Sequence, residues 1–198
     1  MPNVVLKTYA ELPDFDQREI LRYAGYRGET DERTAALLDE CLREVRNAFD
    51  GRVAYLEMTA EEFFSEFDGV EGLRTTRLKD AESVLIFAAT VGLTIDRLTA
   101  KYATVSTAKA LVFQAIGAER IEALCDCFCE GIAENYNRQG YTVGARFSPG
   151  YGAFPLAAQK DMFRLLDCPK KIGVSLQDSL LMTPTKSVTA VMAIQKKV

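Results

Sequence analysis

Histidine is absent from this sequence of 198 residues. Without an imidazole, the chain cannot assemble a Ser-His-Asp or Cys-His nucleophile system, a zinc site that uses histidine or a haem site with a proximal histidine. The five cysteines are an odd number and have no paired spacings, which favours a reducing compartment over a disulfide framework. We therefore expect any catalysis to depend on the positioning of bound groups.

Basic clusters and long apolar runs are missing as well. The formal net charge is -4 and the pI is near 5.1, and no run of Lys or Arg offers the surface that nucleic acid requires. The longest apolar stretch, residues 84–93, is about half the length that crosses a bilayer. The N-terminus resembles neither a secretory nor an organellar leader. We expect no nucleic-acid partner, no membrane span and a cytoplasmic location.

Apolar spacing predicts a mixture of helices and strands that do not alternate regularly. Helical spacing is found over residues 16–24, 30–49, 94–102, 105–137 and 155–166, the fourth being one long helix. Strands are predicted over residues 52–58, 83–89, 172–176, 180–183 and 188–194, the last three antiparallel because their connections are short. Residues 59–67 fit a helix or an edge strand. The prediction is an α+β fold, with a mixed or antiparallel twisted sheet packed with helices, including one long central helix.

The segment from Arg146 to Tyr151 is the most informative local motif. Pro149 and Gly150 occupy the second and third positions of a four-residue turn from Ser148 to Tyr151, which predicts a type II turn with positive φ at the glycine. Gly150 would let a ligand approach the backbone, Arg146 offers a planar fork for a carboxylate, and Tyr151 offers a ring for stacking. The alternative is a loop whose arginine makes a surface ion pair and whose tyrosine covers the core.

Two other clusters are interpreted as packing residues. Cys125 and Cys129 share one face of the predicted long helix while Cys127 points away. Three thiols therefore cannot converge on a metal, and we predict small buried residues and no metal site. The aromatic residues Phe63, Phe64 and Phe67 are predicted to belong to the core.

Several ordered segments together resemble a known family. They are REILRYAGYRG near the start, LIFAATVGLTIDRL, AERIEA in the long helix, ARFSPGYGAFP, and GVSLQDSLLMTPTKSVTAVMAI near the end. Residues 84–194 resemble the C-terminal reactivation region of cobalamin-dependent methionine synthases, and the first segment resembles small free-standing members of that family. The loop departs from the family pattern at Gly152 and Phe154, where the family has Pro and Cys. No tyrosine follows Ile194 to match one that helps hold the ligand in the family.

The resemblance implies a ligand and a set of residues that bind it. In the family, the domain binds S-adenosylmethionine and caps the cobalamin. Carried over, Arg146 would hold the methionine carboxylate, the backbone around Ser148 and Gly150 would line the ligand, and Tyr151 would lie against the corrin. Glu122 would contact the ligand from the long helix, with Asp126, one turn later, as the alternative.

A different interpretation of the acidic residues on this helix is that they form one solvated stripe, consisting of Glu119, Glu122, Asp126, Glu130 and Glu134.

The function implied by the resemblance is that of a reactivation component. With a cobalamin-binding methionine synthase module or another corrinoid protein, and an electron donor, the chain would support reductive methylation of cob(II)alamin. The cobalamin would be carried by the partner, because this chain has no histidine to bind cobalt. The alternative is a docking module that regulates a corrinoid methyltransferase without using S-adenosylmethionine. We expect a single domain over residues 1–198, with a helical and mixed part at 1–80 and the ligand-binding part at 84–194.

Overall fold

An antiparallel sheet forms the centre of the computed structural model, which describes residues 3–28 and 30–197. Its strand order is β1-β2-β3-β7-β4. The strands are β1 (Val5–Tyr9), β2 (Gly51–Thr59), β3 (Ser83–Thr90), β7 (Ser187–Lys196) and β4 (Tyr141–Val143), and every pairing is antiparallel. A separate small hairpin pairs β5 (Ser175–Leu176) with β6 (Met182–Thr183).

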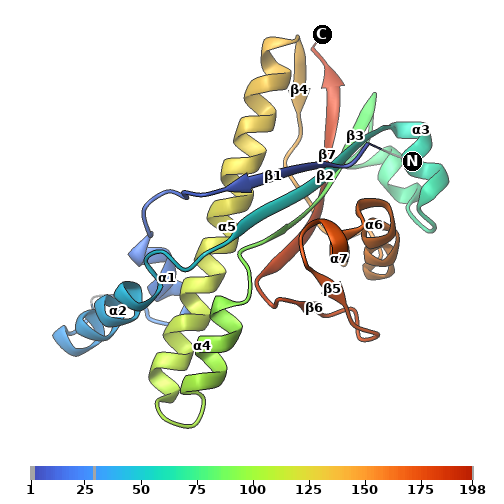
Figure 1. Cartoon of the computed structure of the whole chain (residues 1–198). Helices are drawn as coiled ribbons and strands as arrows, with labels where there is room; N and C mark the ends of the chain where they lie inside the picture. Colours follow the sequence, from blue (N-terminus) through green and yellow to red (C-terminus); the bar gives the residue numbers. More distant parts are fainter. Residues whose placement is uncertain (1–2, 29, 198) are drawn as a thin grey trace.

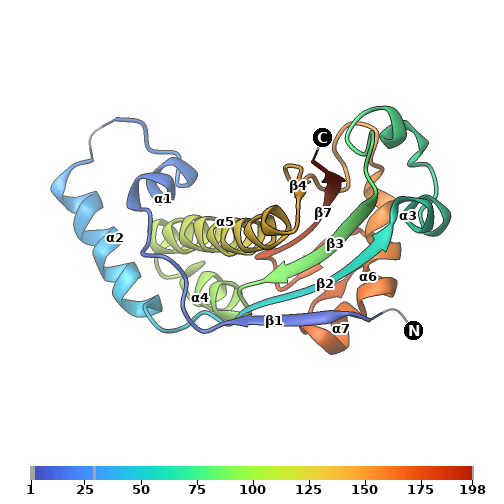
Figure 2. The same ribbon diagram turned by 90° about the horizontal axis from the view of Figure 1, so that it is seen from above.

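Helices cover both faces of the sheet, and further helices lie beyond one of its ends (Figures 1 and 2). The α-helices are α1 (Gln17–Tyr23), α2 (Glu32–Val45), α3 (Ala60–Glu66), α4 (Thr94–Tyr102), α5 (Thr107–Arg138), α6 (Gln159–Leu166) and α7 (Cys168–Lys171). Short 3₁₀ helices, η1 and η2, span Glu71–Thr75 and Leu156–Ala158. Figure 2 shows α1, α2 and α4 at one end of the molecule and α3, α6 and α7 at the other.

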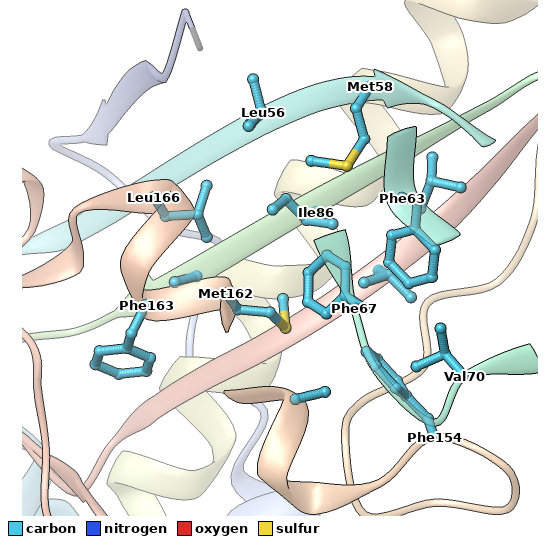
Figure 3. Close-up of a cluster of buried hydrophobic side chains, with 14 of the residues drawn as sticks. Leu56, Met58, Phe63, Phe67, Val70, Ile86, Phe154, Met162, Phe163 and Leu166 are labelled. Carbon is cyan, nitrogen blue, oxygen red and sulfur yellow. The ribbon is translucent and has the colours of Figure 1, made fainter. Parts of the chain in front are cut away.

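The two faces of the sheet pack against different helices, because successive side chains of a strand point to opposite faces. On one face Phe87 of β3 meets Phe128 of α5, with ring centroids 4.9 Å apart. On the other face the core includes Phe63 of α3, Met162 of α6 and the loop residue Phe154 (Figure 3). The α+β prediction with one long helix is thereby confirmed.

A third apolar cluster surrounds the N-terminal half of α5. Helices α1, α2 and α4 contribute Ile20, Leu38 and Ile95 to it. Gly117 allows the close approach of α4 to α5, because a Cβ there would lie 2.8 Å from a side-chain atom of Ile95. Helix α5 runs through Gly117 without a break.

Most of the predicted helices and strands are found near the expected residues. Residues 59–67, which fitted either element, are mostly helix α3, which starts directly after Thr59 because Thr59 and Glu62 form a reciprocal capping box. Helix α2 ends at Val45, four residues earlier than predicted. Pro155 lies directly before η2 and not within a helix. Helix α6 ends at Leu166 as predicted and is followed by Asp167, whose φ is 48°. Phe63 and Phe67 are buried, as predicted, and Phe64 is half-buried against the same core.

The prediction for the strands needs three corrections. Strands β1 and β4 were not predicted, although they form the two edges of the sheet. The strand expected over 172–176 is reduced to Ser175–Leu176, because Ile172 caps helix α7. The strand expected over 180–183 is reduced to Met182–Thr183, because Leu180 lies in a turn with a φ of 65°. The antiparallel pairing of these two pieces agrees with the prediction.

Candidate functional site

Arg146 reaches α5 because of the strand geometry next to it. The following residue, Phe147, forms an antiparallel bridge with Val191 of β7, with N–O distances of 2.9 and 3.1 Å. The Phe147 side chain packs against the core that contains Phe154. Since neighbouring residues of an extended segment point to opposite faces, Arg146 points to the face that α5 covers.

The guanidinium of Arg146 lies between two carboxylates of α5. It donates to Glu122 at 2.7 Å through Nη2 and to Asp126 through Nη1, and the Sγ atom of Cys129 lies 4.0 Å from Nη1. The Arg146 side chain is 24% exposed. Partial burial alone would lower its pKa, but hydrogen bonding to Asp126 and the neighbouring negative groups raise that pKa above the ordinary value. Arg146 is therefore charged at every physiological pH.

The structure thus brings Arg146 together with Glu122 and the alternative residue Asp126, which precede it by 24 and 20 positions in the sequence. The alternative interpretation, in which the acidic residues of this helix form one solvated stripe, is wrong at Glu119. That residue is 5% exposed and forms an ion pair with the buried Arg120. Glu122 is half-buried, while Asp126, Glu130 and Glu134 are exposed.

The turn after Arg146 has the predicted type II geometry. Gly150 has a φ of 96°, and the amide of Tyr151 donates to the carbonyl of Ser148 at 3.4 Å. The amide of Gly150 donates to the carbonyl of Phe154 at 2.8 Å, which fixes the turn to a residue that is completely buried. Tyr151 at the tip is 75% exposed. The tyrosine therefore does not cover the core, and its ring is available for an external partner.

Two cavities lie beside the ion-pair group formed by Arg146, Glu122 and Asp126. One of about 540 Å³ is lined by Glu122 and Asp126 and also by Tyr23 of α1. The other, of about 300 Å³, is lined by Arg146, and Glu130 lines both. A charged group at their shared boundary can contact a ligand from either side.

The N-terminal part of the chain contributes to the larger cavity, which sequence reasoning missed. Pro13, Asp14 and Asp16 precede α1 and line it together with Tyr23. Burial, and secondarily the nearby Glu122, raise the pKa of Tyr23. Over 100 residues separate this segment from Glu119, which it contacts, so no local pattern could have indicated the contact.

The cysteines of α5 are positioned as the helical spacing predicts. Cys125 is buried, and burial raises the pKa of its thiol. Cys127 and Cys129 are half-buried and line different cavities. In the described residues, 3–28 and 30–197, no group of three His, Cys, Asp or Glu side chains is arranged to hold a metal ion.

Comparison with known proteins identifies the family. Residues 73–198 match the family model described as "Vitamin B12 dependent methionine synthase, activation domain". The chain belongs to this activation-domain family. The match contains β3, the long helix α5 and the Arg146–Tyr151 turn, so it includes the whole ion-pair group.

The activation-domain fold also extends over the N-terminal part of the chain. The crystal structure of the MetH reactivation domain bound to AdoHcy is similar with a TM-score of 0.68, and the similarity covers 96% of this chain and 78% of that one. The sequence identity is 18%, so this likeness concerns the fold. No curated protein sequence matches the chain. Within the part that the structure describes, no helix is both long and apolar enough to span a membrane.

Proposed function

We propose that this chain binds S-adenosylmethionine and supports the reductive methylation of cob(II)alamin held by a corrinoid partner. The observation that carries the proposal is the position of Arg146, which α5 holds between Glu122 and Asp126 next to a rigid type II turn. Membership of the activation-domain family and the likeness to a domain that binds AdoHcy support it.

The charges of the ion-pair group fit the amino-acid end of S-adenosylmethionine, which carries a carboxylate and an ammonium group. A guanidinium has five N–H donors in a planar fork, and Arg146 uses some of them for Glu122 and Asp126. The carboxylate of the ligand would bind the guanidinium of Arg146, and the ammonium group of the ligand would bind the carboxylates of Glu122 and Asp126. Binding would then exchange one set of charge-assisted hydrogen bonds for another, without leaving a charge unpaired.

The turn fits the remainder of the ligand. Gly150 has no side chain and a φ that other residues rarely adopt, so the backbone at Ser148 and Gly150 can approach a ligand closely. Tyr151 presents an exposed ring beyond the turn. We assign this ring to contact with the corrin of the partner, because a flat aromatic surface matches a flat macrocycle.

We assign the cobalamin to the partner; this chain has no histidine that could supply an imidazole ligand to cobalt. In the reaction, S-adenosylmethionine supplies the methyl group and an external donor supplies one electron. The residues of this chain bind and orient the methyl donor at the exposed end of the turn. The partner is a methionine synthase module or a related corrinoid protein.

Calorimetry with S-adenosylmethionine tests the proposal. We expect Arg146→Ala to weaken binding by about tenfold or more, which is ~1.4 kcal/mol, because a charge-assisted contact contributes about 1.5–3 kcal/mol. Arg164→Ala is the matched control: Arg164 also bridges two carboxylates, those of Glu66 and Asp161, but packs near α3 and α6. It should bind like the unaltered protein. Absence of binding at millimolar ligand would refute a direct role for the isolated chain.

A docking module that does not use S-adenosylmethionine is the second candidate. Tyr151 and Leu156 favour it, because both are exposed apolar residues, at 75% and 45%, and Leu156 lies against Gly150 of the turn. Binding of a corrinoid protein that is weakened by Tyr151→Ala but unaffected by Arg146→Ala or by the ligand would identify this function.

A further inference from the structure

The loop that carries Tyr151 contains two glycines with positive φ. Gly150 and Gly152 have φ values of 96° and 58°, and glycine leaves the backbone more freedom than any other residue. At one end the loop is anchored by Phe154, which is completely buried and bonded to the amide of Gly150 at 2.8 Å. The exposed part, from Tyr151 to Ala153, needs a second support if its position is to be fixed.

That support is the η1 segment, residues 69–78, which follows α3. A Cβ atom added to Gly72 would lie only 2.9 Å from the Cβ atom of Ala153, which is closer than real Cβ atoms approach one another. A Cβ atom added to Gly69 would lie 3.8 Å from Cγ of Pro155, an ordinary contact distance. The η1 segment therefore lies directly against the loop on both sides of Phe154.

Gly72 is required for space and not for its backbone conformation. It lies inside η1, and its φ is outside the left-handed region that favours glycine. An alanine could adopt the same backbone, and the obstacle to it is the methyl group of Ala153. Because that methyl group is attached directly to the backbone, it cannot rotate away. One of the two backbones would have to shift.

The η1 segment is the side that is held in place. Val70 and Leu73, on either side of Gly72, are 0% and 1% exposed and belong to the core that also contains Phe154. Figure 3 shows Val70 beside the Phe154 ring. The carbonyl of Gly72 also accepts a hydrogen bond from Oγ1 of Thr76 at 2.8 Å. Moving η1 would therefore disturb both the core and this hydrogen bond.

The loop is the side that would move. Ala153 is exposed and follows Gly152. A displacement of Ala153 would pass through Gly152 to Tyr151 and to Gly150, because these residues are consecutive and the amide of Phe154 is bonded to the carbonyl of Tyr151 at 3.1 Å. These are the residues that the proposed function places against the ligand and the corrin.

We propose that Gly72 is a positioning residue for the turn. Because it has no side chain, η1 can hold the loop where the backbone of Ser148 and Gly150 lines S-adenosylmethionine and where Tyr151 meets the corrin. This inference rests on the proposed function and adds to it a segment that comes more than 70 residues earlier in the chain.

A double-mutant cycle of Gly72→Ala and Ala153→Gly tests the contact. Gly72→Ala alone should weaken the binding of S-adenosylmethionine about fivefold in calorimetry, which corresponds to one ordinary hydrogen bond. In the Ala153→Gly background the same substitution should have little effect, because the added Cβ atom then finds space. Thermal unfolding of each variant shows whether the fold is retained, and a role in stability alone would lower Tm without lowering the affinity.

Gly131→Ala is the matched control. Gly131 lies in α5, where the nearest atom that an added Cβ would meet is Nζ of Lys7 at 3.6 Å, an ordinary contact. It is not among the residues that line the two cavities beside Arg146. This variant should bind S-adenosylmethionine like the unaltered protein.

The possible outcomes separate this inference from the proposed function. If the unaltered protein binds S-adenosylmethionine and Gly72→Ala binds it equally well, or if the loss of affinity persists in the Ala153→Gly background, Gly72 does not position the turn and the inference is overturned. If the unaltered protein does not bind the ligand, the proposed function itself fails, and the inference fails with it.

Discussion

Removing one partner of the buried Glu119–Arg120 ion pair should destabilise the protein far more than removing a surface pair. The perturbations are Arg120→Met and Glu119→Leu, made singly and together. Each replaces a charged side chain with an apolar one of similar length. Both residues lie under the strap of residues 10–16, and their side chains are 3% and 6% exposed.

The structure sets the magnitude. A single replacement leaves the other charge buried without a partner, which costs about 3–5 kcal/mol. For a chain of this length, a loss of 1 kcal/mol lowers Tm by about 2–4 °C, so a fall of about 6–20 °C is expected. The double variant should lose less than the sum of the two single variants, because no buried charge remains. It should still be less stable than the unaltered protein, since the carbonyls of Pro13 and Asp14 lose their donor.

Urea unfolding at pH 7, followed by circular dichroism, measures the free energy of unfolding of each variant. Arg22→Met, in an exposed pair with Glu19, is the control and should change the free energy of unfolding by less than about 1 kcal/mol. If the single variants lose no more than this control, or if their losses simply add in the double variant, the two side chains are not a coupled buried pair and the reasoning is refuted.

Three further predictions concern the turn, the core and the thiols. Gly150→Ala should lower stability by about 1–3 kcal/mol in thermal unfolding, because the φ of 96° strains any other residue. Phe154→Ala should cost about 3–5 kcal/mol by the same measurement and loosen the turn, since this completely buried ring fills the core under it (Figure 3); an unchanged Tm would contradict that packing. Burial raises the pKa of Cys41 to about 11 and that of Cys168 to about 12. Since the thiolate is the reactive form, alkylation at pH 8 followed by mass spectrometry should find both unmodified until the protein is unfolded.

The sequence predicts the elements whose own residues determine their burial. Strand β3 is a continuous apolar run because both of its faces are covered, and α4 has its predicted bounds. Strand β1 is exposed along most of its length, so its residues show no alternation between a buried and an exposed side. Backbone pairing with β2 defines it. Ile172 and Val174 illustrate the opposite error. Both are buried, at 2% and 1%, but they pack as loop and cap residues, so an apolar pair was mistaken for a strand.

The candidate site likewise has one part that the sequence predicts and one that it does not. The type II turn was predictable, because Pro149 and Gly150 determine it locally. The resemblance to a family implied that Arg146 and Glu122 each contact the ligand, but their direct ion pair was not predicted, because a sequence contains no local sign of a contact between residues 24 positions apart.

Glu119 and Glu122 show why the acidic pattern on α5 could not be resolved from the sequence. Both lie on one side of the same helix, and hydrophobic periodicity treats them as equivalent polar positions. Their environments differ because of segments far away in the chain: the strap and Arg120 enclose Glu119, whereas Glu122 faces Arg146 and the cavity. A buried carboxylate requires a partner and a water-excluding cover, and on this helix only Glu119 has both. The burial of each acidic residue is therefore determined by the segments that pack against the helix. The segment of residues 10–16 buries Glu119 and also lines the cavity that Glu122 faces.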